Sequence, residues 1–192
     1  MRLLFMGPPG AGKGTQASTL SIKLSVPQIS TGDVFRQNAA DQTELGQTAQ
    51  RYMDAGEYVP DEVTNEMVRA RLAEDDAREG FLLDGYPRTV DQVETLDSIL
   101  DELGEELEAV VVLTAHSEEL IKRLLKRAET SGRTDDTEEV IRHRQNVYVE
   151  QTAPLLDVYR DRGILVEVDG AGDVDEVAAR VVDALPAATE EA

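Results

Sequence analysis

The stretch Leu3-Leu4-Phe5-Met6-Gly7-Pro8-Pro9-Gly10-Ala11-Gly12-Lys13 places an apolar run directly before a glycine-rich loop that ends in lysine. The loop matches the pattern G-x-x-x-x-G-K, which cradles nucleotide phosphates when it follows a strand and opens a helix. Small residues let backbone N–H groups converge on a phosphate, and the helix N-terminus adds partial positive charge. A glycine-rich turn without a ligand is the alternative, and we favour phosphate binding because the lysine is present.

Outside this loop, apolar runs alternate with stretches of helical periodicity. We expect strands at 3–6, 27–29, 81–83, 109–113 and 164–168, and helices at 15–24, 33–40, 44–54, 61–73, 90–103, 118–128, 137–160 and 174–185. Buried strands that alternate with helices predict an α/β fold of three layers, a P-loop fold with a parallel central sheet and helices on both faces. Ligands of such folds bind beyond the carboxyl ends of the strands.

The segment between the expected strands at 27–29 and 81–83 holds about three helices. That is too much for one crossover, so we expect a small helical insertion to project from the domain. We expect a single domain over 1–186, followed by a flexible acidic tail at 187–192.

Composition excludes several classes of protein. The 192 residues include 19 basic and 39 acidic ones, a net charge of −20, and no cysteine. Without cysteine there is no disulfide, thiolate metal site or cysteine nucleophile. An acidic surface argues against nucleic acid and anionic membranes as partners. No apolar stretch approaches a membrane span and the start does not resemble a signal peptide, so we expect a soluble, cytoplasmic protein and, without an obvious exposed apolar face, a monomer.

The first 36 residues are basic, unlike the rest of the chain. They hold four basic residues (Arg2, Lys13, Lys23 and Arg36) and one acid, Asp33, a net charge of +3 against −23 for the rest of the chain. Such a segment suits an anion, although chance clustering explains the charge equally well.

Five parts of the chain together resemble the adenylate kinases, a family of nucleoside monophosphate kinases. They are residues 7–16, in which Gly14-Thr15 follows the lysine; Gln28-Ile-Ser-Thr-Gly-Asp33 with Arg36; Val59-Pro-Asp-Glu62; Phe81-Leu-Leu-Asp-Gly-Tyr-Pro-Arg-Thr89; and Arg123, Arg127, Arg133 and Arg144. The resemblance covers nearly the whole chain in order. It departs from the family at Tyr86, usually Phe, and at Tyr58, usually aliphatic; both keep bulk, and we expect neither to touch the chemistry.

The resemblance implies the reaction ATP + AMP ⇌ 2 ADP, which maintains adenine nucleotide balance, with magnesium as cofactor and ATP, AMP and ADP as ligands. It implies a monophosphate-binding insertion at about 30–59 and a lid at about 127–136. Only residues 128–132 separate Arg127 from Arg133, so the lid is of the short form, and without cysteine a zinc-binding lid is excluded. Ser131 and Gly132 offer the flexible geometry that a closing loop needs.

The resemblance also implies individual contacts. ATP would be contacted by Gly10, Ala11, Gly12, Lys13, Gly14, Thr15, Arg127 and Gly172. AMP would be contacted by Thr31, Arg36, Glu57, Tyr58, Val59, Gly85, Arg88, Gln92, Arg133 and Arg144. Catalysis would rest on Lys13, Asp84, Arg88, Arg123, Arg133 and Arg144. Among these, Gln92 would read the adenine edge, and Glu57 and Val59 would contact the nucleoside mainly through their backbone.

Phosphoryl transfer needs alignment and charge neutralisation more than covalent help. Arginine forks suit phosphate because they bind it bidentately. Asp84 ends an apolar strand and so projects into the crevice of the loop, where it suits a magnesium ion held through water; no direct protein ligand is expected. A turn role before Gly85 is the alternative. Asp33 either shares those waters or caps the helix that carries Arg36.

Several residues, and the class of function itself, allow a second interpretation from the sequence. Arg123 and Arg127 are expected in the site, but their helix also allows an i,i+4 pair with Glu119. Asp135-Asp136 resembles the acidic pair that engages lid arginines, or is a solvated acidic turn. A kinase for another monophosphate is disfavoured by Thr31 and Gln92. A P-loop hydrolase or switch protein is disfavoured by the arginine-rich acceptor site, and an inactive nucleotide-binding module by the presence of the loop lysine and of the motif residues at 84 and 88.

Overall fold

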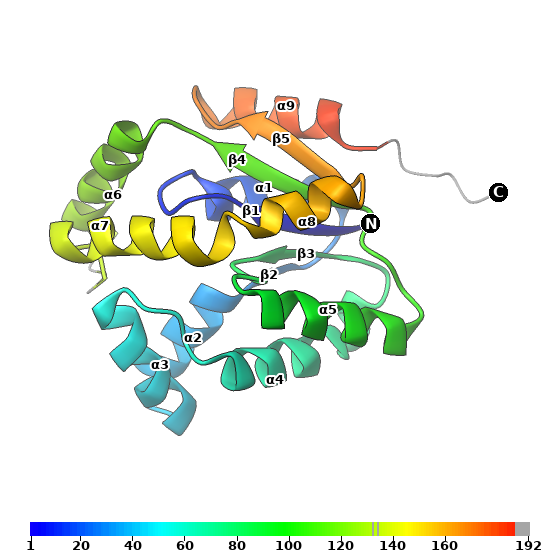
Figure 1. The fold of residues 1–192 in the computed structure, drawn as a ribbon, viewed down its shortest axis with the longest axis horizontal. Helices are drawn as coiled ribbons and strands as arrows, with labels where there is room; N and C mark the ends of the chain where they lie inside the picture. The colour runs from blue at the N-terminus through cyan, green and yellow to red at the C-terminus, as the bar shows by residue number, and fades with distance from the viewer. Residues whose placement is uncertain (132, 134, 187–192) are drawn as a thin grey trace.

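The computed structural model describes residues 1–131, 133 and 135–186, and these residues build a three-layer α/β domain around one sheet (Figure 1). The sheet within this described part has five strands: β1 (Arg2–Met6), β2 (Gln28–Ser30), β3 (Phe81–Asp84), β4 (Ala109–Thr114) and β5 (Leu165–Asp169). They are parallel, in the spatial order β2-β3-β1-β4-β5. The predicted fold class and all five predicted strands are confirmed, with ends that differ by one residue.

Helices connect the strands and cover both faces of the sheet. They are α1 (Lys13–Leu24), α2 (Thr31–Ala40), α3 (Glu44–Ala55), α4 (Asp61–Leu72), α5 (Val90–Leu103), α6 (Ser117–Ser131), α7 (Glu138–Val147), α8 (Leu155–Asp161) and α9 (Val174–Ala184), with a 3-10 turn at Asp75–Ala77. Each helix except α8 starts within two residues of a sequence-based expectation. Among the described residues, no helix is both long and apolar enough to cross a membrane.

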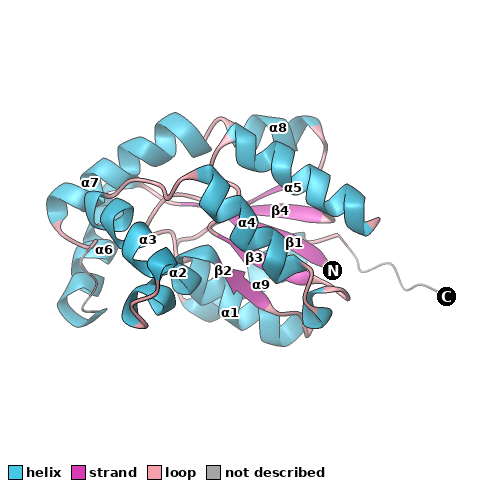
Figure 2. Ribbon diagram, turned by 90° about the horizontal axis from the view of Figure 1, so that it is seen from below, coloured by secondary structure: helices cyan, strands magenta, loops and turns pink. Residues whose placement is uncertain are grey.

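The core divides into two layers because successive strand residues point to opposite faces of the sheet. Leu4 of β1 faces α4, α5 and α8, where it joins a cluster that includes Leu96. Leu3 faces the other way and joins a cluster with Leu20 of α1 and Val181 of α9. Figure 2 shows the sheet between these two sets of helices. This packing fixes the sheet, and hence the loops at its carboxyl edge.

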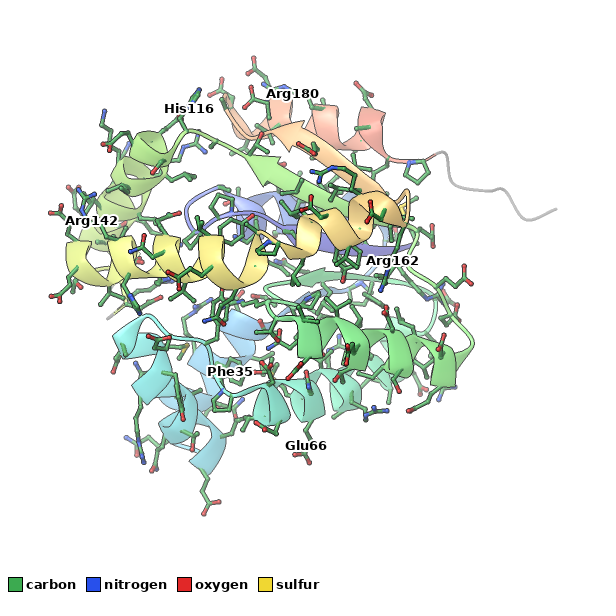
Figure 3. All side chains as sticks on the ribbon, in the orientation of Figure 1. Phe35, Glu66, His116, Arg142, Arg162 and Arg180 are labelled. Atoms are coloured by element: carbon green, nitrogen blue, oxygen red, sulfur yellow. The ribbon has the colours of Figure 1, made fainter. Side chains whose placement is uncertain are left out.

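The segment between β2 and β3 holds three α-helices, as expected, and the first two of them form the insertion. α2 and α3 pack on each other around Phe35 (labelled in Figure 3), Ala49 and Val59. Their crossing is close, since a Cβ on Gly46 would lie 2.1 Å from the backbone of Asn38. α4 instead packs with α5 on the main body, where Val68 is completely buried.

The predicted continuous helix at 137–160 is wrong. α7 ends at Val147, a π-helical turn follows at Tyr148–Thr152, and α8 begins after Pro154. Proline has no N–H to donate to the preceding turn and its ring crowds that turn, so a regular helix cannot run through it. The periodicity of the apolar residues concealed this break.

α6 is longer than predicted and ends at Ser131, so that the first part of the expected lid is helical. Gly132, expected to lend the lid flexibility, and the expected tail at 187–192 lie outside the described residues.

Candidate active site

Strand register brings the motifs of three distant segments to one edge of the sheet. Asp84, the last residue of β3, lies opposite Phe5 of β1 on one side and opposite Ser30 of β2 on the other. The glycine-rich loop begins two residues after Phe5, and α2 begins directly after Ser30. The loop, Asp84 and the start of the insertion therefore meet beyond the carboxyl ends of the strands, where α/β folds bind their ligands.

Glycine is required in the loop by its backbone conformation. Gly7 has φ 133°, and a Cβ on it would lie 2.6 Å from the carbonyl oxygen of Leu113. Gly12, which precedes the first turn of α1, has φ 92°. L-residues with side chains rarely adopt such angles. The loop consequently wraps tightly and presents the N-terminus of α1 to the cleft in front of it.

Lys13 lies at the start of a helix and not in an exposed loop. It is the first residue of α1 and is partly buried, and its Nζ donates to the carbonyl oxygens of Gly7 (2.8 Å) and Pro8 (3.1 Å). Burial, with Arg88 and other cations nearby, lowers the pKa of Lys13 to about 8, although the carboxylate of Asp84 opposes this shift. The loop therefore carries a desolvated amine whose charged form a bound anion would stabilise.

Asp84 is a nearly buried carboxylate at the floor of this cleft, with 8% of its surface exposed. Burial raises its pKa, while Lys13 and Arg88 oppose that shift. No hydrogen bond to its carboxylate is present among the described residues, so the turn role does not account for it. Its Oδ2 lies 3.6 Å from the point where a Cβ on Gly14 would be, beside the loop. A hydrated cation between the loop and the carboxylate would complete this group.

Six arginines from five parts of the chain line the cleft in front of the loop. They are Arg36, Arg88, Arg123, Arg127, Arg133 and Arg144. Burial lowers the pKa of Arg133 and of Arg144, and neighbouring arginines act in the same direction. So many cations in one cleft are tolerable only with anions between them, which is the electrostatic signature of a phosphate site.

Two buried aspartates form ion pairs with two of these arginines. Nη1 of Arg144 lies 2.7 Å from Asp135, and Nη2 of Arg127 lies 2.6 Å from Asp136. Asp135 and Asp136 are 8% and 4% exposed, so the solvated acidic turn is wrong. Arg127 lowers the pKa of Asp136, although burial opposes this shift. The pair ties α6 to α7 across the lid segment.

The structure also bears on the two interpretations of Arg123 and of Asp33: both hold together for Arg123, and one is excluded for Asp33. Arg123 forms the i,i+4 ion pair with Glu119 and still lines the cleft, donating to the carbonyl of Gly170 at 3.1 Å. Asp33 is not the helix cap, because the Ser30 side chain accepts from the Asp33 N–H. The Asp33 carboxylate instead pairs with Arg36 and lines the cleft.

A second pocket lies next to the cleft, under the insertion. Its wall includes Thr31, Val59 and Gln92, and the Thr31 hydroxyl donates to the Gly85 carbonyl at 3.0 Å. Gln92 is 2% exposed; its Oε1 accepts from the Arg88 N–H (2.7 Å) and its Nε2 donates to Asp61 (2.6 Å). One amide hydrogen and one oxygen lone pair of Gln92 have no partner among the described residues.

The two pockets share a wall of cations. Lys13, Arg36, Arg88 and Arg144 line both of them. On one side of this wall is the glycine-rich loop, and on the other is the partly apolar pocket under the insertion. Two ligands bound in this arrangement would bring their phosphates together at the shared cations.

Comparison with known proteins identifies a family of nucleotide kinases. The family model for adenylate kinase matches residues 5–164. The chain belongs to the adenylate kinase family. Its reaction is ATP + AMP = 2 ADP, so it is a nucleotide-binding phosphotransferase, a nucleoside monophosphate kinase.

Relatives of this family match over almost the whole chain. The adenylate kinase of Kocuria rhizophila is 64% identical over 184 residues, which cover 96% of this chain and 98% of the relative. That of Clavibacter michiganensis subsp. michiganensis is 60% identical, with 96% of this chain and 92% of the relative covered. That of Thermobifida fusca is 57% identical, with 96% and 98% covered.

The structure brings together most of the residues expected in the site. All those expected to contact AMP line the pocket under the insertion, except Arg133, which lines the neighbouring cleft. Of those expected to contact ATP, two are placed elsewhere. Ala11 is buried in the core and its N–H bonds to the Pro8 carbonyl, and Gly172 lies before α9, outside the residues that line the cleft.

Some supporting residues were not found from the sequence. Gln145 of α7 donates to the Pro9 carbonyl at 2.8 Å and so holds the phosphate loop. Asp61 holds Gln92, a role that its place in the segment after Val59 does not reveal. Thr152 donates to the Arg88 carbonyl at 2.9 Å. Nothing local marks these residues, because each acts on a segment far away along the chain.

Proposed function

We propose that AMP binds in the pocket under the insertion and that ATP binds in the cleft in front of the glycine-rich loop. The γ-phosphoryl group then passes across the shared wall of Lys13, Arg36, Arg88 and Arg144. The observation that carries this assignment is that the same cations line both pockets. In-line transfer needs the two phosphates aligned and their charge neutralised, and a shared set of cations does both.

Each part of the site then has a role. The backbone amides of Gly10, Gly12, Gly14 and Thr15 and the amine of Lys13 hold the ATP phosphates, and Arg36, Arg88 and Arg144 hold the AMP phosphate. Arg123, Arg127 and Arg133 neutralise charge around the transferred group. The lid at about 127–136 excludes water, since water would otherwise accept the phosphoryl group.

Magnesium fits this site through the carboxylate of Asp84, which has no hydrogen-bond partner in the part of the chain that the structure describes. We propose that Asp84 and Asp33 hold the ion through water and that ATP supplies its direct oxygen ligands. The ion would neutralise charge on the transferring phosphates. The described residues contain no cluster of three His, Cys, Asp or Glu side chains that could hold a metal directly.

The same proposal covers organisation and environment. We propose a monomer that acts in the cytoplasm, with the insertion at about 30–59 and the lid at about 127–136 as its moving parts. Two features support it: the large exposed apolar side chains of the described residues are spread over several elements, and the net charge of −20 disfavours nucleic acid and anionic membranes.

Substrate choice tests the proposal directly. With ATP and magnesium, AMP is expected to give ADP without inorganic phosphate, and the other nucleoside monophosphates far less. Gln92→Ala is expected to reduce the preference for AMP about five- to tenfold, because it removes a neutral hydrogen-bonding group of ~1 kcal/mol or more. The measurement is chromatography of the products for each monophosphate. Inorganic phosphate as the main product, or an unchanged preference in Gln92→Ala, would contradict these assignments.

The pKa of Lys13 predicts a pH dependence of ATP binding. The amine has a pKa of about 8 in the free protein, and a bound triphosphate stabilises its protonated form. Above pH 8, binding must include uptake of a proton, so we expect the affinity for ATP to fall about tenfold between pH 7 and pH 9. Calorimetric titration with ATP in the absence of AMP measures this. Lys13→Arg stays protonated and is expected to lose the dependence; a flat profile for the unmodified enzyme would refute the lowered pKa.

A further inference from the structure

Tyr58, one of the two departures from the family pattern, contacts the residue expected to clamp the AMP phosphate. It lies in the segment between α3 and α4 and lines the pocket under the insertion. The guanidinium carbon of Arg88 lies 4.9 Å from the centre of its ring. The negative face of an aromatic ring attracts a guanidinium at this distance. The sequence did not indicate this contact between Tyr58 and Arg88.

A chain of hydrogen bonds reaches the other end of Arg88. The Tyr58 hydroxyl lies 2.8 Å from Oγ1 of Thr152, and Thr152 donates to the Arg88 carbonyl at 2.9 Å. A carbonyl oxygen only accepts, so the single hydroxyl hydrogen of Thr152 is used there. Tyr58 must therefore be the donor to Thr152. Through these contacts Tyr58 acts on Arg88 at its guanidinium and at its backbone.

The position of Thr152 depends on the π-helical turn. Thr152 is the last residue of that turn and is 4% exposed. π-Turns inside helices often mark functional sites, because the extra residue re-aims the side chains that follow. Here the turn places a hydroxyl between Tyr58 of the insertion and Arg88 of the main body, 94 residues from Tyr58 in sequence.

The N–H, the carbonyl oxygen and the Nε of Arg88 all form hydrogen bonds, and its two terminal nitrogens do not among the described residues. Its N–H donates to Gln92 at 2.7 Å, and its Nε donates to the Gly85 carbonyl at 2.7 Å. Among the described residues, no hydrogen bond takes up Nη1 or Nη2. Those two nitrogens form the fork that binds a phosphate bidentately. The hydrogen bonds to the rest of Arg88 therefore fix the direction in which these two nitrogens point.

We propose that Tyr58 is a positioning residue for the phosphoryl transfer reaction. Its ring supports the Arg88 guanidinium, and its hydroxyl, through Thr152, fixes the Arg88 backbone. Tyr58 belongs to the last segment of the insertion. The orientation of the terminal nitrogens of Arg88 therefore depends on the position of the insertion relative to the main body. This inference rests on the proposed role of Arg88 in binding the AMP phosphate.

Steady-state kinetics of four variants test the proposal. Tyr58→Leu, which removes ring and hydroxyl, is expected to raise KM for AMP about tenfold and to leave KM for ATP unchanged. Tyr58→Phe and Thr152→Val keep the ring and break the hydrogen-bond chain, and each is expected to raise KM for AMP about two- to fivefold. Tyr52→Leu is the control, because Tyr52 is an exposed tyrosine of α3 in the same insertion, and no change is expected. Equal rises for AMP and ATP in Tyr58→Leu would overturn the proposal. An unchanged KM for AMP would overturn either this proposal or the role of Arg88, and the next measurement separates the two.

A measurement without AMP separates this proposal from the role of Arg88. The Nε–H signal of Arg88 in nitrogen-15 NMR of the ligand-free enzyme, assigned with Arg88→Lys, is expected to be protected from exchange in the unmodified enzyme and exposed in Tyr58→Leu. Loss of protection without a change in KM for AMP would mean that Tyr58 positions Arg88 but that Arg88 does not bind AMP. Unchanged protection in a folded Tyr58→Leu would show that Tyr58 does not position Arg88.

Discussion

Lys13→Ala is expected to lower kcat about a hundred- to a thousandfold while the enzyme stays folded. The amine is the cation of the glycine-rich loop, and it lines both pockets, at the wall where we propose that the two phosphates meet. Removing one preorganised group that stabilises transition-state charge has effects of this size in other enzymes. ATP binding is expected to weaken about tenfold as well, as it does when the amine loses its proton, and the loss in kcat adds to this because the transferring phosphates lose a cation that neutralises their charge.

The fold is expected to survive because Lys13 contributes little net stability. Its Nζ bonds to two loop carbonyls, but burial disfavours its charge, as its lowered pKa records. These effects oppose each other, so we expect the melting temperature to change by only a few degrees. Lys23→Ala, an exposed lysine in the last turn of the same helix, is the control and should keep full activity. An active Lys13→Ala enzyme would refute the mechanism; an unfolded one would refute the account of its stability.

Arg88→Ala is expected to raise KM for AMP about a hundredfold and to leave the affinity for ATP within a factor of about three. In the proposed function Arg88 makes two charge-assisted hydrogen bonds to the AMP phosphate, and such bonds contribute about 1.5–3 kcal/mol each before compensation by water and neighbouring arginines. Arg88 lies in the loop that follows β3 and lines both pockets, and the proposed function assigns it to the AMP phosphate. Separate titrations with AMP and with ATP measure the two affinities.

Arg162→Ala is the matched control for this variant. The Arg162 guanidinium also lies over a tyrosine, 5.4 Å from the ring centre of Tyr159, and pairs with Asp97. Figure 3 shows it at the opposite end of the molecule from α6 and α7. Its loss is expected to leave both affinities unchanged. If Arg88→Ala weakened AMP and ATP equally, its place on the acceptor side would be wrong.

Much of the site was predictable because its motifs act within a few residues. The glycine-rich loop works through its own backbone, and its glycines are needed by local angles such as that of Gly7. Asp84 could be placed because it ends a buried strand, and parallel strands end at a common edge. The arginines at 36 and 88 could be selected because each stands inside a matched segment.

Contacts between distant segments could not be read from short-range patterns. The sequence shows that Lys13 follows the loop but not that it folds back and is buried, which depends on what packs over it. Asp135 and Asp136 look like a solvated turn until α6 and α7 bring arginines to them. The third helix after β2 has the pattern of any amphipathic helix, and only its contact with α5 assigns it to the main body.

By itself, the sequence determined the fold class, the phosphate loop and the order of the chemical groups along the chain, because these follow from periodicity and from motifs whose residues act locally. Only the tertiary structure decided which of these groups face one another. Tyr58, Arg88 and Thr152 stand 30 to 94 residues apart, and their contacts depend on the sheet register, the π-helical turn and the place of the insertion. No local pattern encodes such contacts, since each exists only after several separate elements have packed together.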